Sequence, residues 1–176
     1  MSNRPFVIGI DGPSGAGKTQ LAAVLAAALD DAQVLHLEDL YPGWGGLEAV
    51  VPRLVAWVLE PVSAGRRARW RRWDWVAGRY AEWHQLAPCA VLVVDGAGVG
   101  ARACAPYLDV LLWLEAPEAV RYARAMGRDG LTYRPHWRGW SAAERAHVAR
   151  EGTRERADVV LSSAERLVAA ADDTPG

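Results

Sequence analysis

The chain has 176 residues, a formal net charge of −1 and 51% hydrophobic residues. These values are typical of one compact cytoplasmic domain with a substantial core. With a net charge so close to zero, the chain has no overall electrostatic field that would favour nucleic acid or membrane surfaces. No apolar run is long enough to span a bilayer, and the N-terminus has no signal-like segment. Cys89 and Cys104 lack metal-ligand spacing.

The first predicted elements are a strand, a glycine-rich loop and a helix. Residues 6–10 form a short apolar run that predicts a buried strand, and residues 20–29 are rich in strong helix formers. Between them, residues 12–19 read GPSGAGKT and match the pattern G-x-x-x-x-G-K-[ST]. Glycines allow the tight turn, and successive N–H groups and the positive helix end then face an anion. This stretch therefore predicts a nucleotide-phosphate site.

The phosphate-binding loop assigns roles to individual side chains. Lys18 is expected to reach the β- and γ-phosphates, and the Thr19 hydroxyl to hold Mg²⁺, so ATP and Mg²⁺ are the expected cofactors. The residues predicted to bind the nucleotide here are Gly12, Ser14, Gly15, Ala16, Gly17, Lys18, Thr19 and Gln20.

A second strand is predicted at residues 33–37, and it ends at two adjacent carboxylates, Glu38 and Asp39. Phosphoryl transfer to an alcohol needs a carboxylate that orients the hydroxyl and accepts its proton. One of the two is therefore the candidate base, although both could be ordinary surface residues. A Pro- and Gly-rich loop follows at residues 40–46.

The next stretch has helical spacing from residue 47 to residue 60, and Pro61 is expected to end that helix. In residues 65–84, basic and aromatic residues then interleave. Such a stretch indicates a nucleic-acid surface, a solvated face over buried tryptophans, or a substrate-binding lobe. The lobe is favoured, because the nearby loop already supplies a phosphate.

The clearest buried strand is predicted at residues 90–94 and ends at Asp95. An acidic residue at the carboxyl end of such a strand, facing a phosphate loop, is where Mg²⁺ water ligands are held. Asp95 is therefore predicted to be a metal-site residue, with a simple turn residue as the alternative.

A further strand is predicted at residues 110–114 and a helix at residues 118–128. Arg121, Arg124 and Arg128 share one face of that helix. They indicate either a solvated face or a lid that closes on the transferring phosphate.

The last third of the chain is predicted to contain a loop, a helix and a strand before its end. Residues 131–140 are expected to be a loop, and Ser141 with Glu144 matches a capping box for a helix that Gly152 ends. A final strand at residues 157–161, a closing helix at 163–171 and a frayed tail at 172–176 are expected. The alternation of strands and helices predicts an α/β fold with a mainly parallel sheet.

With these pieces in order, the chain resembles the uridine kinase-like family of P-loop kinases, which includes nicotinamide riboside kinases. The resemblance covers most of the chain and implies a three-layer α/β/α domain over residues 1–176, with five strands in the order 2-3-1-4-5. It also implies an acceptor-binding region at about 39–84 and a lid at about 121–140. Beyond the phosphate-binding loop, the matching segments are 36–41, 72–79, 94–96, 121–129 and 153–160.

The family pattern carries roles onto matching residues. It places Glu38 at the base position, with Asp39 kept as the alternative, and it gives Arg124 and Arg128 to catalysis. Arg121 and Thr153 would lie near the nucleotide. The implied acceptor-binding residues are Tyr41, Trp44, Trp73, Asp74 and Arg79.

The chain also departs from the family pattern. Residues 76–78 read VAG where uridine-specific members have a histidine, and Ala125 stands where an arginine pair is common. The type of reaction is therefore better indicated than the acceptor.

Three functions remain open from the sequence. The favoured one is a kinase that phosphorylates a hydroxyl of a nucleoside-like small molecule. The others are a kinase whose acceptor is itself a monophosphate, and an ATPase or switch that binds a macromolecular partner. Membrane and nucleic-acid partners are disfavoured, whereas exposed tryptophans between residues 44 and 83 leave a homodimer surface open.

Overall fold

A five-stranded parallel sheet forms the centre of the computed structural model, which describes residues 4–163. Its strands are β1 (Phe6–Asp11), β2 (Ala32–His36), β5 (Val91–Asp95), β6 (Val110–Glu115) and β7 (Val159–Ser162). They lie in the order β2-β5-β1-β6-β7, and every neighbouring pair is parallel. When only these strands are numbered along the chain, the order is 2-3-1-4-5, so the predicted fold and strand order are confirmed.

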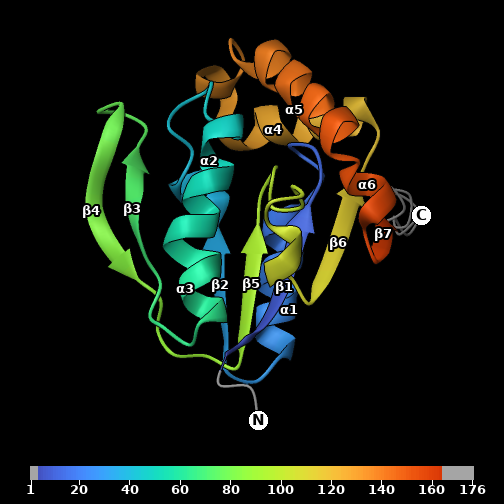
Figure 1. Ribbon diagram of the computed structural model, residues 1–176. Coiled ribbons are helices and arrows are strands. Elements are labelled where there is room, and N and C mark those ends of the chain that lie inside the picture. The colour runs from blue at the N-terminus through green and yellow to red at the C-terminus, as the bar shows by residue number, and fades with distance from the viewer. Residues whose placement is uncertain (1–3, 164–176) are drawn as a thin grey trace, which may run out of the picture.

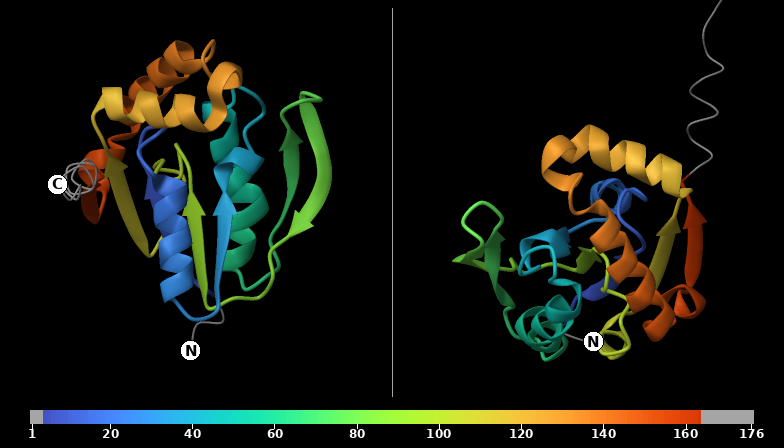
Figure 2. Two further views of the ribbon diagram at one scale, coloured as in Figure 1. Left: turned by 180° about the vertical axis from the view of Figure 1, so that it is seen from behind. Right: turned by 90° about the horizontal axis from the view of Figure 1, so that it is seen from above.

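Helices cover both faces of the sheet and its carboxyl end. They are α1 (Lys18–Ala28), α2 (Leu47–Leu54), α3 (Glu60–Ser63), α4 (Glu118–Tyr133), α5 (Trp137–Glu151) and α6 (Thr153–Arg156). Helix α1 lies on one face, α2 and α3 lie on the other, and α4 and α5 cross above the strand ends (Figures 1 and 2). Among the described residues, no helix combines the length and apolar character needed to cross a membrane.

Strand alternation divides the core into two layers. Ile8 and Ile10 of β1 pack with Val93 of β5 and Ala22 of α1. The neighbouring β1 residue Val7 belongs to the larger cluster on the opposite face. Successive side chains of a strand point to opposite faces, so these apolar runs bury both sides of the sheet. This rigid centre fixes the strand ends, where the candidate site lies.

An antiparallel hairpin stands apart from the main sheet (Figure 1). It consists of β3 (Arg69–Asp74) and β4 (Arg79–Gln85), with a register shift between Arg71 and Trp73. The sequence pattern marks this region as basic and aromatic but predicts no strands in it. Two hydrogen bonds join the hairpin to the segment after β2, from Trp75 Nε1 to the Glu38 carbonyl and from Tyr80 Oη to the Leu40 carbonyl.

Pro61 does not end the helix that precedes it, contrary to the prediction. A π-helical turn at Val55–Leu59 links α2 to α3, and the chain stays helical to Ser63. In this turn the Glu60 N–H bonds to the Val55 carbonyl, five residues back. Pro61 then lies in the first turn of α3, where its missing N–H needs no partner.

The predicted loop at residues 131–140 is wrong over most of its length. Helix α4 is kinked at Gly130 (φ 51°, ψ −127°), a further helical segment runs from there to Tyr133, and α5 begins at Trp137. Ser141 therefore lies inside α5, not at its N-cap, and Glu144 makes no capping box. The end of α5 at Gly152, in a left-handed conformation with φ 62°, is as predicted. Most of the predicted closing helix (163–171) and the whole predicted tail (172–176) lie outside the described residues.

Candidate active site

The phosphate-binding loop is pressed between the end of β6 and the start of α4. Gly12 and Gly15 adopt φ values of 142° and 79°, which favour glycine. A Cβ at Gly12 would lie 2.0 Å from the Leu114 carbonyl oxygen, and one at Gly15 would lie 2.3 Å from the Arg121 carbonyl oxygen. Helix α1 begins directly after this loop, at Lys18. Its N-terminal N–H groups therefore stand next to the loop, as an anion site requires.

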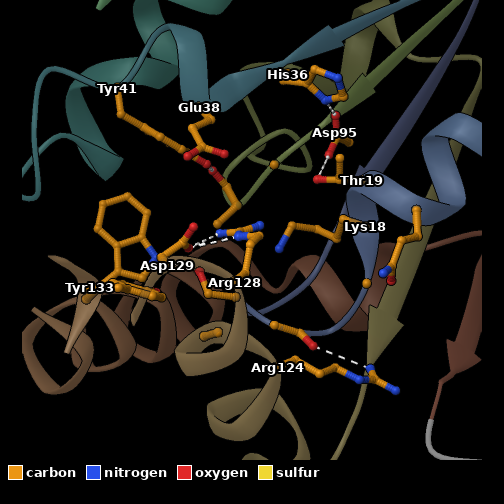
Figure 3. Close-up of a pocket in the computed structure, with 18 of the residues that line it drawn as sticks. Lys18, Thr19, His36, Glu38, Tyr41, Asp95, Arg124, Arg128, Asp129 and Tyr133 are labelled. Carbon is orange, nitrogen blue, oxygen red and sulfur yellow. Dashed lines mark hydrogen bonds and ion pairs between the residues drawn. The ribbon is translucent and has the colours of Figure 1, made fainter. Parts of the chain in front are cut away.

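Lys18 is held by the loop to which it belongs. Its Nζ donates hydrogen bonds to the carbonyl oxygens of Gly12 at 2.6 Å and Pro13 at 3.1 Å. Burial lowers the pKa of Lys18, while the nearby carboxylates of Glu144 and Asp11 act in the opposite direction. The ammonium group thus stands at the loop, and it points into the space that Arg128 also faces (Figure 3).

Thr19 and Asp95 meet at the carboxyl end of the sheet. The Thr19 hydroxyl donates to Asp95 Oδ2 at 3.0 Å, and His36 Nδ1 lies 2.5 Å from Asp95 Oδ1. The hydrogen bond with Asp95 raises the pKa of His36. A hydroxyl and a carboxylate beside a phosphate loop fit Mg²⁺, which takes few protein oxygens and keeps waters and substrate oxygens as other ligands. The described residues contain no cluster of three or more His, Cys, Asp or Glu with metal-ligand geometry.

One cavity of about 730 Å³ connects the phosphate-binding loop to a group of aromatic side chains (Figure 3). On the loop side it is lined by Ser14, Gly15, Gly17, Lys18, Thr19 and Gln20. The opposite side, here called the aromatic wall, consists of Tyr41, Trp44, Trp75, Tyr133 and Trp140. Trp44 lies at its centre, stacked on Tyr133 with a centroid distance of 4.9 Å and an interplanar angle of 15°. The wall joins the loop after β2 to the helices above the sheet.

The two adjacent carboxylates after β2 have different surroundings. Both lie in a short 3-10 helix at Leu37–Asp39, but only Glu38 lines the cavity. Asp39 is half-buried, and this burial raises its pKa. Asp39 interacts electrostatically with His36 of β2 and with His84 and Arg72 of the hairpin. Glu38 is therefore the carboxylate that a molecule in the cavity would meet.

The three arginines of α4 lie beside the phosphate-binding loop or on the cavity lining. Arg121 is buried and donates from Nη1 to the Ser14 carbonyl at 3.1 Å. Arg124 lines the cavity, and its Nη1 lies 3.4 Å from each of the Gly15 and Ala16 carbonyl oxygens. Arg128 also lines the cavity and pairs with Asp129 through bonds of 2.8 and 2.6 Å. Two arginines thus face the cavity, and the third supports the loop from behind.

Eight of the predicted site residues do not line the cavity. Four of them, Gly12, Ala16, Asp39 and Arg121, belong to the phosphate-binding loop or to the segments beside the cavity that are described above. The other four have different roles. Asp74 Oδ1 accepts from the N–H groups of Val76 at 3.0 Å and Ala77 at 2.8 Å, so it shapes the hairpin turn. Thr153 is fully buried, and a Cβ at Gly100 would lie 2.3 Å from its Cγ2. Trp73 packs against Tyr80 within the hairpin, and Arg79 is exposed at the start of β4.

The cavity is also lined by residues that the site prediction omitted, namely His36, Trp75, Gly96, Ala97, Ala125, Asp129, Thr132, Tyr133 and Trp140. His36, Trp75 and Asp129 carry polar or aromatic side chains and stand inside segments that the family resemblance covers, so the resemblance could have indicated them. Tyr133 and Trp140 were missed because residues 131–140 were predicted to be a loop, and no pattern places a loop aromatic in a particular site.

The chain was compared with known proteins. No protein-family model matches it. It is 30% identical over 156 residues to dephospho-CoA kinase from two strains of Xanthomonas campestris pv. campestris, 8004 and ATCC 33913, and the match covers 75% of this chain and 73% of each relative. The chain belongs to the P-loop kinases.

Solved structures agree with this P-loop kinase fold. A possible uridine kinase from Bacillus stearothermophilus has a TM-score of 0.66 at 21% identity, over 90% of this kinase and 89% of that chain. A candidate fructose transport system kinase from Silicibacter sp. TM1040 also has a TM-score of 0.66, at 20% identity, over 90% of each chain. At the level of fold, these similarities confirm the predicted resemblance to the uridine kinase-like kinases.

Proposed function

We propose that this P-loop kinase transfers the γ-phosphate of ATP to a hydroxyl group of a nucleoside-like small molecule. The observation that carries the proposal is the single cavity that joins the phosphate-binding loop to the aromatic wall, with Glu38 on its lining. A phosphate donor and a planar acceptor can occupy the two ends at once, and this proximity is what an in-line transfer requires.

At the nucleotide end, the loop amides and Lys18 would bind the phosphates, and Thr19 and Asp95 would hold Mg²⁺. When bound, the metal supplies positive charge that offsets the charge developing on the transferred group. Arg124 and Arg128 stand on the lid side of the same cavity and would add further positive charge there.

At the acceptor end, the aromatic wall would stack on a planar ring and leave the sugar hydroxyl toward the phosphates. Glu38 would orient that hydroxyl and accept its proton as the new O–P bond forms. Asp39 stays the alternative base, although it does not line the cavity.

A monophosphate acceptor is less well supported than a nucleoside. Such an acceptor needs cationic side chains at the acceptor end of the cavity. Arg128 is paired with Asp129, and no hairpin arginine lines the cavity. The arginine-rich stretch that favoured this alternative therefore lies outside the described pocket.

Dephospho-CoA is a second candidate acceptor, because the curated relatives that match three quarters of this chain are dephospho-CoA kinases. The aromatic wall would accept its adenine ring as readily as the base of a free nucleoside. The acceptor panel described next therefore has to include both.

The test is ADP release from ATP·Mg²⁺ with and without nucleosides, nucleoside monophosphates and dephospho-CoA. We expect a small hydroxyl acceptor to raise the rate, and Lys18→Ala to lower kcat by at least about hundredfold, because a charge aimed at the transferring phosphate is lost. Circular dichroism of the variant should match that of the wild type. A basal rate indifferent to every small acceptor, or full turnover in Lys18→Ala, would contradict the proposal.

A further inference from the structure

Glu144 of α5 brings a buried carboxylate against the phosphate-binding loop. Its side chain is 3% exposed. Its Oε1 accepts hydrogen bonds from Ser14 N at 2.9 Å, Ser14 Oγ at 2.6 Å and Trp140 Nε1 at 2.7 Å. A buried carboxylate is costly unless donors compensate it. Here three donors converge on Oε1, whereas Oε2 is buried without a hydrogen-bond partner. Glu144 and Ser14, which are 130 positions apart in the chain, are thereby held together.

Ser14 is held from two sides by the helices above the sheet. Its N–H donates to Glu144 of α5, while its carbonyl accepts from Arg121 Nη1 of α4 at 3.1 Å. The peptide groups that follow Ser14 are those expected to face the phosphates. Because both backbone polar groups of Ser14 are held, the orientation of the peptide groups that follow Ser14 in the phosphate-binding loop is held as well.

The same carboxylate oxygen also reaches the acceptor end of the cavity. Trp140 belongs to the aromatic wall, and its Nε1–H is shared between Glu144 Oε1 at 2.7 Å and Ser14 Oγ at 2.9 Å. Its ring meets Tyr41 edge-on at a centroid distance of 5.0 Å. Glu144 itself does not line the main cavity. It lines a cavity of about 10 Å³ behind the loop, together with Asp11 and His147. It therefore has no access to the reacting atoms.

We propose that Glu144 is a positioning residue for the phosphate-binding loop, and that through Ser14 and Trp140 it ties the loop to the aromatic wall. This inference rests on the proposed use of ATP. The proposed role is one of position, because a single acceptor oxygen, Oε1 of Glu144, holds three donors in place. Loss of that oxygen frees the Ser14 N–H and lets the loop leave the shape that receives the phosphates.

The test compares Glu144→Ala, Glu144→Met and Glu144→Gln. Alanine removes the acceptor oxygen, and methionine removes it while keeping most of the side-chain volume. We expect both to raise the KM for ATP by about tenfold to hundredfold, the effect of losing one charge-assisted hydrogen bond, and to change the KM for the acceptor less. Glutamine retains an oxygen at the Oε1 position but removes the charge that acts on Lys18. We therefore expect its KM for ATP to lie between that of the wild type and that of Glu144→Ala.

The matched control is Glu151→Ala, on the same helix. Glu151 Oε2 accepts from the Arg102 N–H at 2.9 Å and anchors α5 away from the phosphate-binding loop. We expect this variant to lose some thermal stability and to keep the wild-type KM for ATP. A rise in KM equal to that of Glu144→Ala would mean that any loosening of α5 has the same effect, and it would overturn the positioning role.

Two further results would also overturn the inference. One is an unchanged KM for ATP in Glu144→Met, whose melting curve shows it to be folded. The other is a defect in Glu144→Gln as large as in Glu144→Ala. Titration calorimetry with ATP·Mg²⁺ keeps the test separate from the proposed acceptor, since the Kd for ATP should follow the same order whatever molecule is phosphorylated. If the wild type binds no ATP, that result contradicts the proposed function, whereas it says nothing against the contact between Glu144 and Ser14.

Discussion

Glu38 and Asp39 are neighbours in sequence with different surroundings in the structure. The short 3-10 helix at the end of β2 directs Glu38 to the cavity and leaves Asp39 beside the hairpin. A base must lie within hydrogen-bonding reach of the acceptor hydroxyl, so the place of Glu38 on the cavity lining supports the proposal that Glu38 is the base.

Glu38→Gln should lower kcat by about a hundredfold to ten-thousandfold, because the amide keeps the size of the side chain but cannot take up the proton. The KM for ATP should change little, since Glu38 stands away from the phosphate-binding loop. Asp39→Asn is the matched control, and we expect it to retain most of the activity. Steady-state kinetics on both variants test this assignment. A larger loss of kcat in Asp39→Asn than in Glu38→Gln would instead indicate that Asp39 is the base.

At this scale, the sequence predicted residues whose spacing is itself the signal. Lys18 and Thr19 belong to a short motif with one structural solution, and Asp95 closes an apolar strand. Glu144 was misread because Ser141 and Glu144 satisfy the local pattern of a capping box. Its actual partner, Ser14, is far away in the chain, and no local pattern reports such a contact. Tertiary contacts therefore decided what short-range spacing could not.

At the level of the elements, a titratable carboxylate, Asp109, links the start of β6 to the start of the neighbouring strand β1. Asp109, just before β6, accepts two hydrogen bonds from Arg4, at 2.8 and 2.7 Å, and one from the Val7 N–H at 2.8 Å. The hydrogen bonds from Arg4 lower the pKa of Asp109. The ionised carboxylate is thus favoured in the folded chain, and its contribution is present above the unfolded pKa and lost as the pH falls through the folded pKa.

Asp109→Asn should therefore reduce the free energy of unfolding by about 1 kcal/mol at pH 7, since the ion pair is partly exposed and the amide oxygen can still accept from Val7. The difference from the wild type should shrink as the pH falls below about 4, where unfolded aspartate takes up its proton. Urea unfolding of both proteins at pH 7 and pH 3 measures this. An equal difference at both pH values would show that the ion pair is not its source.

Predictability also differed between elements. The parallel strands are continuous apolar runs, and their sequence alone located them to within one or two residues. The hairpin was missed because its strands are rich in arginine and tryptophan, with a register shift between Arg71 and Trp73 that breaks the alternation. The start of α5 was missed because Trp137 begins the helix without a side-chain cap. Packing of Trp137 and Trp140 into the core stabilises that first turn instead.

For the whole molecule, the cavity lies between the sheet and the helices that cross its carboxyl end. A ligand in this cavity touches the phosphate-binding loop, α4 and α5 together. Its binding should therefore stabilise the whole domain against unfolding. At a concentration one hundred times the Kd, ATP·Mg²⁺ should add about 2.7 kcal/mol. For a chain of this length that corresponds to a rise in Tm of roughly 5–10 °C.

Thermal scans with ATP alone, ATP·Mg²⁺ and ATP·Mg²⁺ plus a non-reactive acceptor analogue test this expectation. The largest shift should come from the last mixture, since both ends of the cavity are then filled. Lys18→Ala serves as the control and should show a smaller nucleotide shift. An identical Tm in all mixtures would contradict the assignment of the cavity as the binding site.

The hairpin of β3 and β4 shares no backbone hydrogen-bond ladder with the parallel sheet. Its sequence can therefore drift, lengthen or be exchanged while the strands that carry the phosphate chemistry keep their registers. Trp75, in the turn of this hairpin, is nevertheless part of the aromatic wall. A change in the length or sequence of the hairpin would therefore alter the aromatic wall without changing the registers of the parallel strands.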